Sequence, residues 1–285
     1  MNISDNYFVR LAQEVGYANF AYRYTLRKLY KLAKVDQKIV LPNGVPMVLP
    51  WHSKFGTELF LKRDRLDWGS ETLLLKFLDR EKSFIDVGAN IGYYSLLAIT
   101  SSCNVYSFEP DPRVVETLKK NLAQFQNAQI IRKALYSEPG TMELSLSASP
   151  ELNSLVRQGS QGQGISVPVT TLDVFMADYP SLSVSAIKTD VEGADFQVLL
   201  GGKSLLIRDQ PLVLSEAYPH KKLLRFAESI DFTVFAFAKP KDKNKSHIAP
   251  ELIKVETQPT NTRVKMIFLV PKRLLSQFAA LATEN

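Results

Sequence analysis

The chain has 285 residues, 45% of them hydrophobic, which is enough to build one large core with a small N-terminal addition. The net charge of +6 permits an anionic partner without requiring one, and the lack of a long unbroken apolar run excludes a membrane-spanning helix. The single cysteine, Cys103, excludes an intrachain disulfide, and no basic-then-apolar leader opens the sequence, so we expect a cytoplasmic protein.

Residues 1–70 are expected to form an N-terminal helical and β-hairpin extension. Between about Asp5 and Lys34 apolar side chains recur at helical spacing with basic residues between them, which predicts amphipathic helices with a basic face. That face is either simply solvated or docks on an acidic partner or peripherally on a membrane. Two apolar runs then flank Asn43-Gly44, a pair that can supply the positive φ angles of a tight hairpin.

The main domain is expected to span residues 71–285. A helix at Leu73–Leu78 leads into it, and from Ser83 onward strands alternate with helical segments. This order predicts an α/β fold with a doubly wound, mostly parallel seven-stranded sheet. Because Lys239–Pro250 has no helical pattern, the last two strands are expected to be antiparallel. The predicted strands are 84–87, 104–108, 129–132, 186–189, 212–215, 232–238 and 264–270, and the predicted helices are 93–100, 112–125, 196–206 and 220–229.

A β-hairpin insertion is expected at about residues 140–170. Thr141–Ser147 and Ser166–Thr170 have strand-like patterns, and the Gly/Ser/Gln-rich stretch Gln158–Gly164 lies between them. Such a stretch is either a surface loop or a lid over a substrate site.

The first chemistry-bearing motif runs from Asp86 to Gly92, between an apolar strand and an apolar helix. Its glycines, Gly88 and Gly92, allow close approach of a ligand, but they do not have the Gly-x-Gly-x-x-Gly spacing of dinucleotide sites. A carboxylate at the mouth of the loop would repel a pyrophosphate and would favour a ligand with a sulfonium and an ammonium group. S-adenosylmethionine (SAM) is such a ligand, and its carboxylate can use N–H groups at the helix start.

The second motif is Glu109-Pro110-Asp111, at the end of the next predicted strand. In a β–helix–β unit this position faces the ribose of a bound nucleoside, where the Glu109 carboxylate can accept hydrogen bonds from both hydroxyls. Asp111 more plausibly caps the helix that begins at Pro112.

Acids also follow the fourth and fifth predicted strands. Asp190 is expected to converge with Asp86 and Glu109, since the carboxyl ends of parallel strands share one edge. Asp190 either holds the ammonium of SAM or takes a proton from the acceptor. Glu192, Glu216 and His220 are acceptor-site candidates, although His220 also suits a helix cap. The three histidines are far apart and there is no cysteine pair, so no metal site is expected.

Taken together, these motifs resemble those of the FkbM-type SAM-dependent methyltransferases. The resemblance rests on 86–95 (DVGANIGYYS), Glu109-Pro110, Ala134-Leu135, 171–173 (TLD) and 187–193 (IKTDVEG), in that order. It implies a class I methyltransferase fold, SAM as cofactor and methyl transfer to oxygen on sugars, polyketides or related natural products. It also implies that Asn90 and Tyr93 of the glycine loop contact the cofactor, that Ala134 and Leu135 flank the adenine, and that Glu71 is an acid found ahead of the loop.

Three alternatives to an O-methyltransferase remain open. One is a nicotinamide-dependent Rossmann oxidoreductase, against which Asp86 and the glycine spacing count. Another is a non-catalytic SAM-binding module. Nucleic-acid methylation is disfavoured, because the chain lacks both an aromatic–basic recognition motif and an Asn-Pro-Pro-aromatic signature. The expected partner is therefore a small-molecule or glycan acceptor, and the sequence leaves the oligomeric state open.

Overall fold

The computed structural model describes residues 7–145, 154–156, 164–242 and 248–282. The predicted N-terminal helices are present as α1 (Tyr7–Val15) and α2 (Tyr17–Ala33), separated by Gly16 at a φ of 86°. The predicted hairpin is present as β1 (Gln37–Val40) and β2 (Pro46–Leu49). Its loop has three residues rather than two: Leu41 pairs with Val45, and of Asn43 and Gly44 only Gly44 has a positive φ, 81°.

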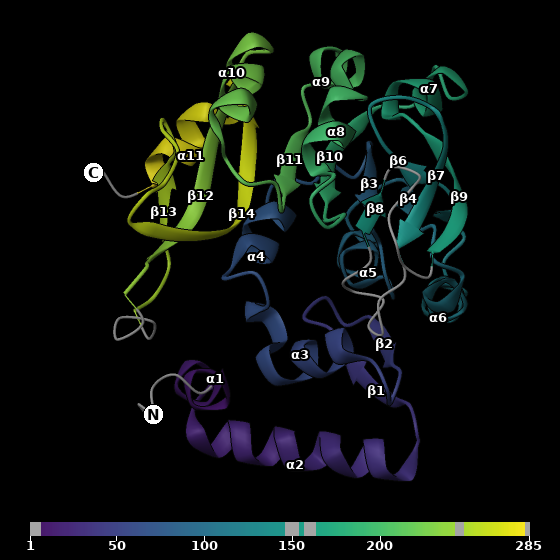
Figure 1. The fold of residues 1–285 in the computed structure, drawn as a ribbon, viewed down its shortest axis with the longest axis vertical. Helices are drawn as coiled ribbons and strands as arrows, with labels where there is room; N and C mark the ends of the chain where they lie inside the picture. Colours follow the sequence, from purple (N-terminus) through teal and green to yellow (C-terminus); the bar gives the residue numbers. More distant parts are fainter. Residues whose placement is uncertain (1–6, 146–153, 157–163, 243–247, 283–285) are drawn as a thin grey trace.

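The central sheet has eight strands in the order β13-β12-β14-β11-β10-β3-β4-β5 (Figure 1). Five neighbouring strands are parallel: β3 (Ser83–Val87), β4 (Val105–Phe108), β5 (Ala128–Ile131), β10 (Val184–Thr189) and β11 (Leu212–Ser215). As predicted, β14 (Thr262–Pro271) runs antiparallel to β12 (Phe232–Pro240), and it is also antiparallel to β11. The eighth strand, β13 (Glu251–Lys254), was not predicted and adds an antiparallel edge to β12.

Helices cover both faces of the sheet, because successive residues of each buried strand point to opposite sides. On β3, for example, Phe84 packs into one hydrophobic cluster and Ile85 into the other. The first cluster lies under the β1–β2 hairpin and the helices α4 (Ser70–Leu75), α5 (Tyr93–Ala98), α6 (Pro112–Leu122) and α11 (Leu275–Leu281). The second lies under α7 (Leu172–Ala177), α8 (Asp195–Leu200), α9 (Lys203–Asp209) and α10 (Lys221–Ser229).

The predicted insertion is a separate small sheet of four strands beside β5. Its members are β6 (Ala134–Leu135), β7 (Gly140–Ser145), β8 (Ser154–Val156) and β9 (Gly164–Thr170), and β7 pairs with β9 antiparallel as a hairpin does. Apart from Gly164, the glycine-rich stretch Gln158–Gly164 lies outside the described residues, so the lid remains a hypothesis.

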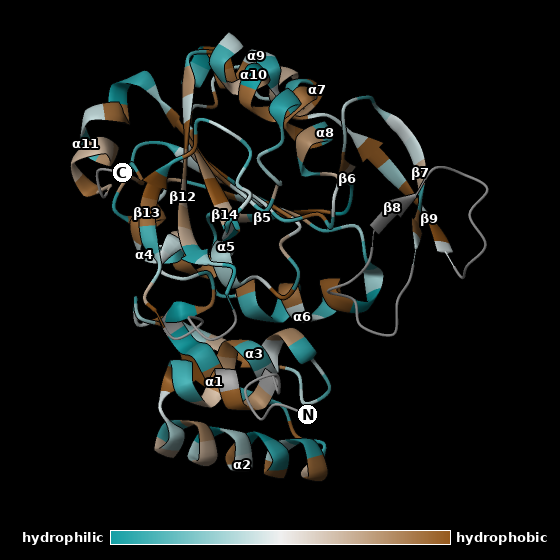
Figure 2. Ribbon diagram, turned by 60° about the vertical axis from the view of Figure 1, so that its left-hand side comes forward, coloured by the Kyte–Doolittle hydropathy of each residue, from teal (hydrophilic) through white to brown (hydrophobic). Residues whose placement is uncertain are grey.

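The N-terminal elements form a layer at one end of the molecule, with α2 outermost and α3 (Lys54–Lys62) between it and the sheet (Figures 1 and 2). The helix α3 was not predicted; it begins where the Ser53 side chain accepts a hydrogen bond from the Gly56 N–H. Among the described residues, no helix combines the length and apolar character needed to cross a bilayer.

Candidate active site

A cavity of about 310 Å³ opens at the carboxyl ends of β3, β4, β10 and β11. β3 and β10 are neighbours, and the helices that follow them cover opposite faces of the sheet. This is the switch point where α/β sheets bind ligands. The predicted site residues that line the cavity are Gly88, Asn90, Tyr93, Glu109, Pro110, Ala134, Leu135, Asp190, Glu192 and Glu216.

The glycine loop is shaped by the neighbouring strand. The N–H groups of Gly88 and Ala89 both donate to the carbonyl oxygen of Phe108 at 3.0 Å. Gly88 has a φ of 72°, and a β-carbon there would stand 2.0 Å from the backbone oxygen of Asp190. Gly92, at a φ of 93°, precedes α5 and faces Leu118 of α6 rather than the cavity. Both glycines therefore allow packing of the protein against itself.

Asp86 lies beneath the loop and does not line the cavity, contrary to its expected place at the loop mouth. Its side chain is fully buried, accepts a 2.6 Å hydrogen bond from Ser95 and lies 3.5 Å from the Nζ of Lys188. Lys188 lines the cavity, donates to the carbonyl oxygen of Gly88 at 2.9 Å and lies 3.7 Å from Asp190. Although burial alone would lower it, the carboxylates of Asp86 and Asp190 raise the pKa of Lys188.

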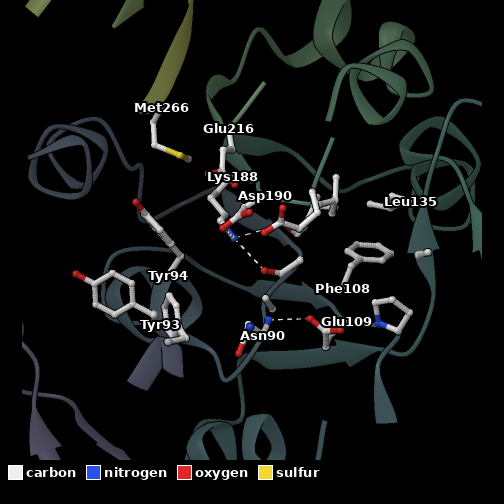
Figure 3. A pocket seen from close by; sticks show the side chains of 18 of the residues that line it. Asn90, Tyr93, Tyr94, Phe108, Glu109, Leu135, Lys188, Asp190, Glu216 and Met266 are labelled. Atoms are coloured by element: carbon white, nitrogen blue, oxygen red, sulfur yellow. Dashed lines mark hydrogen bonds and ion pairs between the residues drawn. The ribbon is translucent and has the colours of Figure 1, made fainter. Parts of the chain in front are cut away.

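Glu109 occupies the position expected of a ribose ligand. One carboxylate oxygen accepts from the N–H of Asn90 at 2.8 Å (Figure 3). The other accepts from the N–H of Asp111 at 2.9 Å. Burial raises the pKa of Glu109 to about 7, against the opposing effect of these two N–H groups. Each oxygen keeps a lone pair for a further donor.

Beside Glu109 the cavity wall is apolar. Phe108 and Leu135 lie together at this end of the cavity (Figure 3), with Pro110, Ala134 and Leu144 also in the lining. Phe108 is held from behind by Phe175 of α7, with the ring centres 5.1 Å apart. Such a slot suits a flat aromatic ring.

At the opposite end three carboxyl groups gather. Asp190, Glu192 and Glu216 each place an oxygen within 4.8 Å of the other two. Burial and a hydrogen bond with Asp190 raise the pKa of Glu216 to about 10. Although burial opposes it, Lys188 and the hydrogen bond from Glu216 lower the pKa of Asp190. The three carboxyl groups are close enough to hold a cation, and a proton on Glu216 reduces the repulsion between them.

The remaining wall comes from residues that the sequence did not single out. Phe55 and Glu58 of α3, Asp67, and Lys265 and Met266 of β14 line the cavity next to the carboxyl cluster. Asp67 accepts from the Tyr94 hydroxyl at 2.5 Å and lies 2.7 Å from the Nζ of Lys265. These groups come from distant parts of the chain, so no local pattern could have revealed them.

Glu71 and His220 do not line the cavity. Glu71 is buried and accepts from the N–H groups of Asp67 and Gly69, so it shapes the turn that presents Asp67. Burial, reinforced by Asp67, raises the pKa of Glu71 to about 7. His220 caps α10: its Nδ1 accepts from the Leu223 N–H at 3.1 Å. His220 therefore acts as a helix cap and does not lie in the cavity where an acceptor was expected to bind.

The strand order and the cavity at the switch point together define a Rossmann-like fold of the class I methyltransferase type. A family model described as the methyltransferase FkbM domain matches residues 86–270, and the chain belongs to that family. The predicted family and fold class are confirmed. Family membership also removes the basis for the nicotinamide-dependent alternative.

Two curated relatives and one solved structure illustrate the likeness. The chain is 28% identical over 130 residues to the hexuronic acid methyltransferase AglP of Haloferax volcanii, covering 45% of this chain and 53% of the relative. It is 24% identical over 142 residues to the 2-O-methyltransferase NoeI of Sinorhizobium fredii, covering 44% and 58%. The chain thus matches little more than half the length of each. The FkbM methyltransferase structure from Methylobacillus flagellatus is 12% identical, with a TM-score of 0.43, covering 88% of this chain and 60% of that one.

Proposed function

We propose that the protein transfers a methyl group from SAM to a hydroxyl of a sugar, a glycan or a similar natural-product-like small molecule. The observation that carries the proposal is that the two ends of the cavity differ in chemistry. One end joins an apolar slot to the Glu109 carboxylate, and the other end holds the Asp190–Glu216 pair. A nucleoside fits the first end, and an acceptor that must lose a proton fits the second.

The residues of the first end fit SAM. The free lone pairs of Glu109 suit the two ribose hydroxyls, and the slot of Phe108, Ala134 and Leu135 suits the adenine. When bound, SAM supplies a methyl group on a positively charged sulfur. The ionised Asp190 favours the positive charge of such a ligand, and it also lies 3.7 Å from the buried ammonium of Lys188.

Asp190 is the proposed recipient of the acceptor proton because it is ionised and lines this end of the cavity, although Lys188 and Glu216 weaken it as a base. Transfer forms a carbon–oxygen bond and breaks the carbon–sulfur bond, whose electron pair stays on sulfur, so the hydroxyl proton must leave the oxygen. An ionised carboxylate can take that proton as the bond forms. Glu216, which already holds a proton, orients Asp190 through their hydrogen bond. Much of the rate would come from alignment of the two reactants.

The proposed acceptor class rests on the second end of the cavity and on the relatives. Glu58, Asp67 and Lys265 give that end both acceptors and donors, which suits a polyhydroxylated molecule. One relative is named for a hexuronic acid and the other for 2-O-methylation. A non-catalytic SAM-binding module is the competing possibility, and it differs from the proposal in that it would bind SAM without transferring the methyl group.

The test has two stages. Titration calorimetry should detect binding of SAM and of its demethylated product, S-adenosylhomocysteine. Labelled SAM should then transfer its methyl group to members of a panel of hexuronic acids, neutral sugars and oligosaccharides. Failure to bind either cofactor form would refute the SAM proposal. Binding without transfer to any hydroxylated compound or cell-extract component would instead favour the non-catalytic module.

A further inference from the structure

Helix α2 packs Leu26 against the core, but it also buries an arginine and leaves several apolar side chains exposed. A helix on the surface of a globular protein usually buries its apolar stripe and exposes its charges. In α2 the side chain buried most completely is Arg27, which is 1% exposed, whereas Tyr22, Leu29 and Leu32 are 69%, 57% and 82% exposed. The exposure of these apolar side chains requires an explanation, because it leaves apolar surface in contact with water.

The inward side of α2 is held by its cations. The guanidinium of Arg27 donates to the carbonyl oxygen of Pro50 at 2.5 Å and to Gln37 at 3.3 Å. One turn earlier, Arg23 donates to the carbonyl oxygen of Leu61 at the end of α3, at 2.8 Å. Buried hydrogen bonds from charged donors fix the rotation of the helix about its axis. The apolar residues therefore face outward as a consequence of specific contacts.

The outward side is one continuous stripe. Tyr22, Leu29 and Leu32 recur at intervals of seven and three residues, so they share one face of a 3.6-residue helix. The same face of the helix also carries exposed small side chains, namely Ala18, Ala21, Thr25 and Ala33. Because α2 is the outermost element of the N-terminal layer (Figures 1 and 2), this stripe lies on the surface of the molecule.

The charge around the stripe selects one kind of partner. Arg23 and Arg27 face inward, so the cations left near the stripe are Lys28, Lys31 and Lys34, and no acid lies between Gly16 and Val35. Lys28 and Lys34 are exposed beside the apolar residues. Two copies of such a face would repel each other, whereas an anionic lipid surface would attract it.

We propose that the outward face of α2 docks the protein on anionic membranes, with Tyr22, Leu29 and Leu32 inserted at the level of the lipid headgroups. A helix of 17 residues lies in the plane of the surface over about 25 Å. The exposed lysines meet the headgroups, and Arg23 and Arg27 keep the helix bound to the protein. The proposal concerns where the protein acts and does not depend on the acceptor.

The test uses the full chain with vesicles of phosphatidylcholine alone and of phosphatidylcholine mixed with phosphatidylglycerol. Co-sedimentation should show binding to the anionic vesicles and little binding to the neutral ones. Binding should fall by roughly tenfold or more at about 1 M salt, where charges are screened within about 3 Å. Equal binding to neutral and anionic vesicles would overturn the electrostatic part, and no binding to either would overturn the whole proposal.

A matched pair of variants separates α2 from other exposed apolar surface. Leu32→Glu should lower vesicle binding by roughly tenfold. Ile207→Glu, which places the same charge at a 52% exposed residue of α9 at the far end of the molecule, should leave binding unchanged. Circular dichroism and SAM binding should match wild type in both variants. If the wild type is a dimer in solution and Leu32→Glu is a monomer, the face joins two copies and the membrane proposal is wrong.

Discussion

The carboxyl group of Glu216 shares a hydrogen bond with the carboxylate of Asp190, and the pair carries one proton at neutral pH. The two residues follow adjacent parallel strands, β10 and β11, so the geometry of the sheet brings them together. Partial desolvation and the contact with Asp190 raise the pKa of Glu216, and Lys188 and Glu216 lower the pKa of Asp190. The pair therefore offers an ionised acceptor and a neutral donor side by side.

Replacement of each member should separate their roles. Asp190→Asn removes the proposed proton acceptor, and kcat should fall by roughly 10²–10⁴-fold. Glu216→Gln keeps a neutral donor to Asp190 and should reduce kcat much less. Both are measured by release of S-adenosylhomocysteine with an acceptor from the labelled-SAM screen. If Asp190→Asn retains wild-type kcat, Asp190 is not the proton acceptor.

The proton on Glu216 predicts how stability depends on pH. The pKa of Glu216 is about 10 in the folded protein against an ordinary value of 4.5, so unfolding releases a proton at any pH between these values. Raising the pH should therefore favour unfolding. Glu216→Gln should raise the Tm relative to wild type, and by more at about pH 9 than at about pH 5. Glu116→Gln on the exposed side of α6 is the control and should show no such trend; an equal trend in both variants would contradict the prediction.

Glu109 should be required for the cofactor. Glu109→Ala removes the acceptor for both ribose hydroxyls, and SAM should bind roughly tenfold or more weakly by calorimetry, a loss of about 1.5–3 kcal/mol. Because burial raises the pKa of Glu109 to about 7, wild-type affinity should also fall as the pH drops below that value. Glu116→Ala, at an exposed position, should bind SAM normally. Unchanged affinity in Glu109→Ala would remove Glu109 from the cofactor site.

The glycine loop offers a comparison of two glycines with positive φ. Gly88→Ala should destabilise the protein by roughly 3 kcal/mol or more, from left-handed strain and from the contact with the backbone oxygen of Asp190. Gly44→Ala carries the same strain without a neighbour within 4 Å, and should cost about 1–2 kcal/mol. Urea unfolding measures both. Equal losses would show that the close approach to Asp190 is not needed for stability.

The fold could be predicted because its signals are local. Apolar strands separated by helical segments define the order of elements, and the loop without helical pattern after Ala238 predicted an antiparallel pair. β13 escaped prediction because it is an edge strand of only four residues, whose end residues Glu251 and Lys254 are charged and exposed. The helix α3 escaped because Gly56 interrupts its helical pattern at a point where it packs closely on Leu49 and Arg27.

The site could be predicted only where a local pattern, such as the end of a strand, marks a residue. Glu109 and Asp190 were found because each ends a strand at the shared edge. The side-by-side placement of Lys188 and Asp86 depends on the register of β10 against β3, which the sequence does not specify. A lysine inside an otherwise apolar strand was nevertheless a usable signal, since a buried ammonium requires a partner.

The cavity wall formed by Phe55, Glu58 and Asp67 precedes the stretch that matches the FkbM model, whereas Glu109 and Asp190 lie within it. Part of the wall opposite Glu109 therefore comes from a segment outside the matched stretch, although Asp190, Glu192 and Glu216 lie inside it. Substitutions in α3 can reshape what the cavity accepts without touching the nucleoside end. Under the proposed function, exchange of the segment around α3 offers a route to change the acceptor while the SAM site is kept.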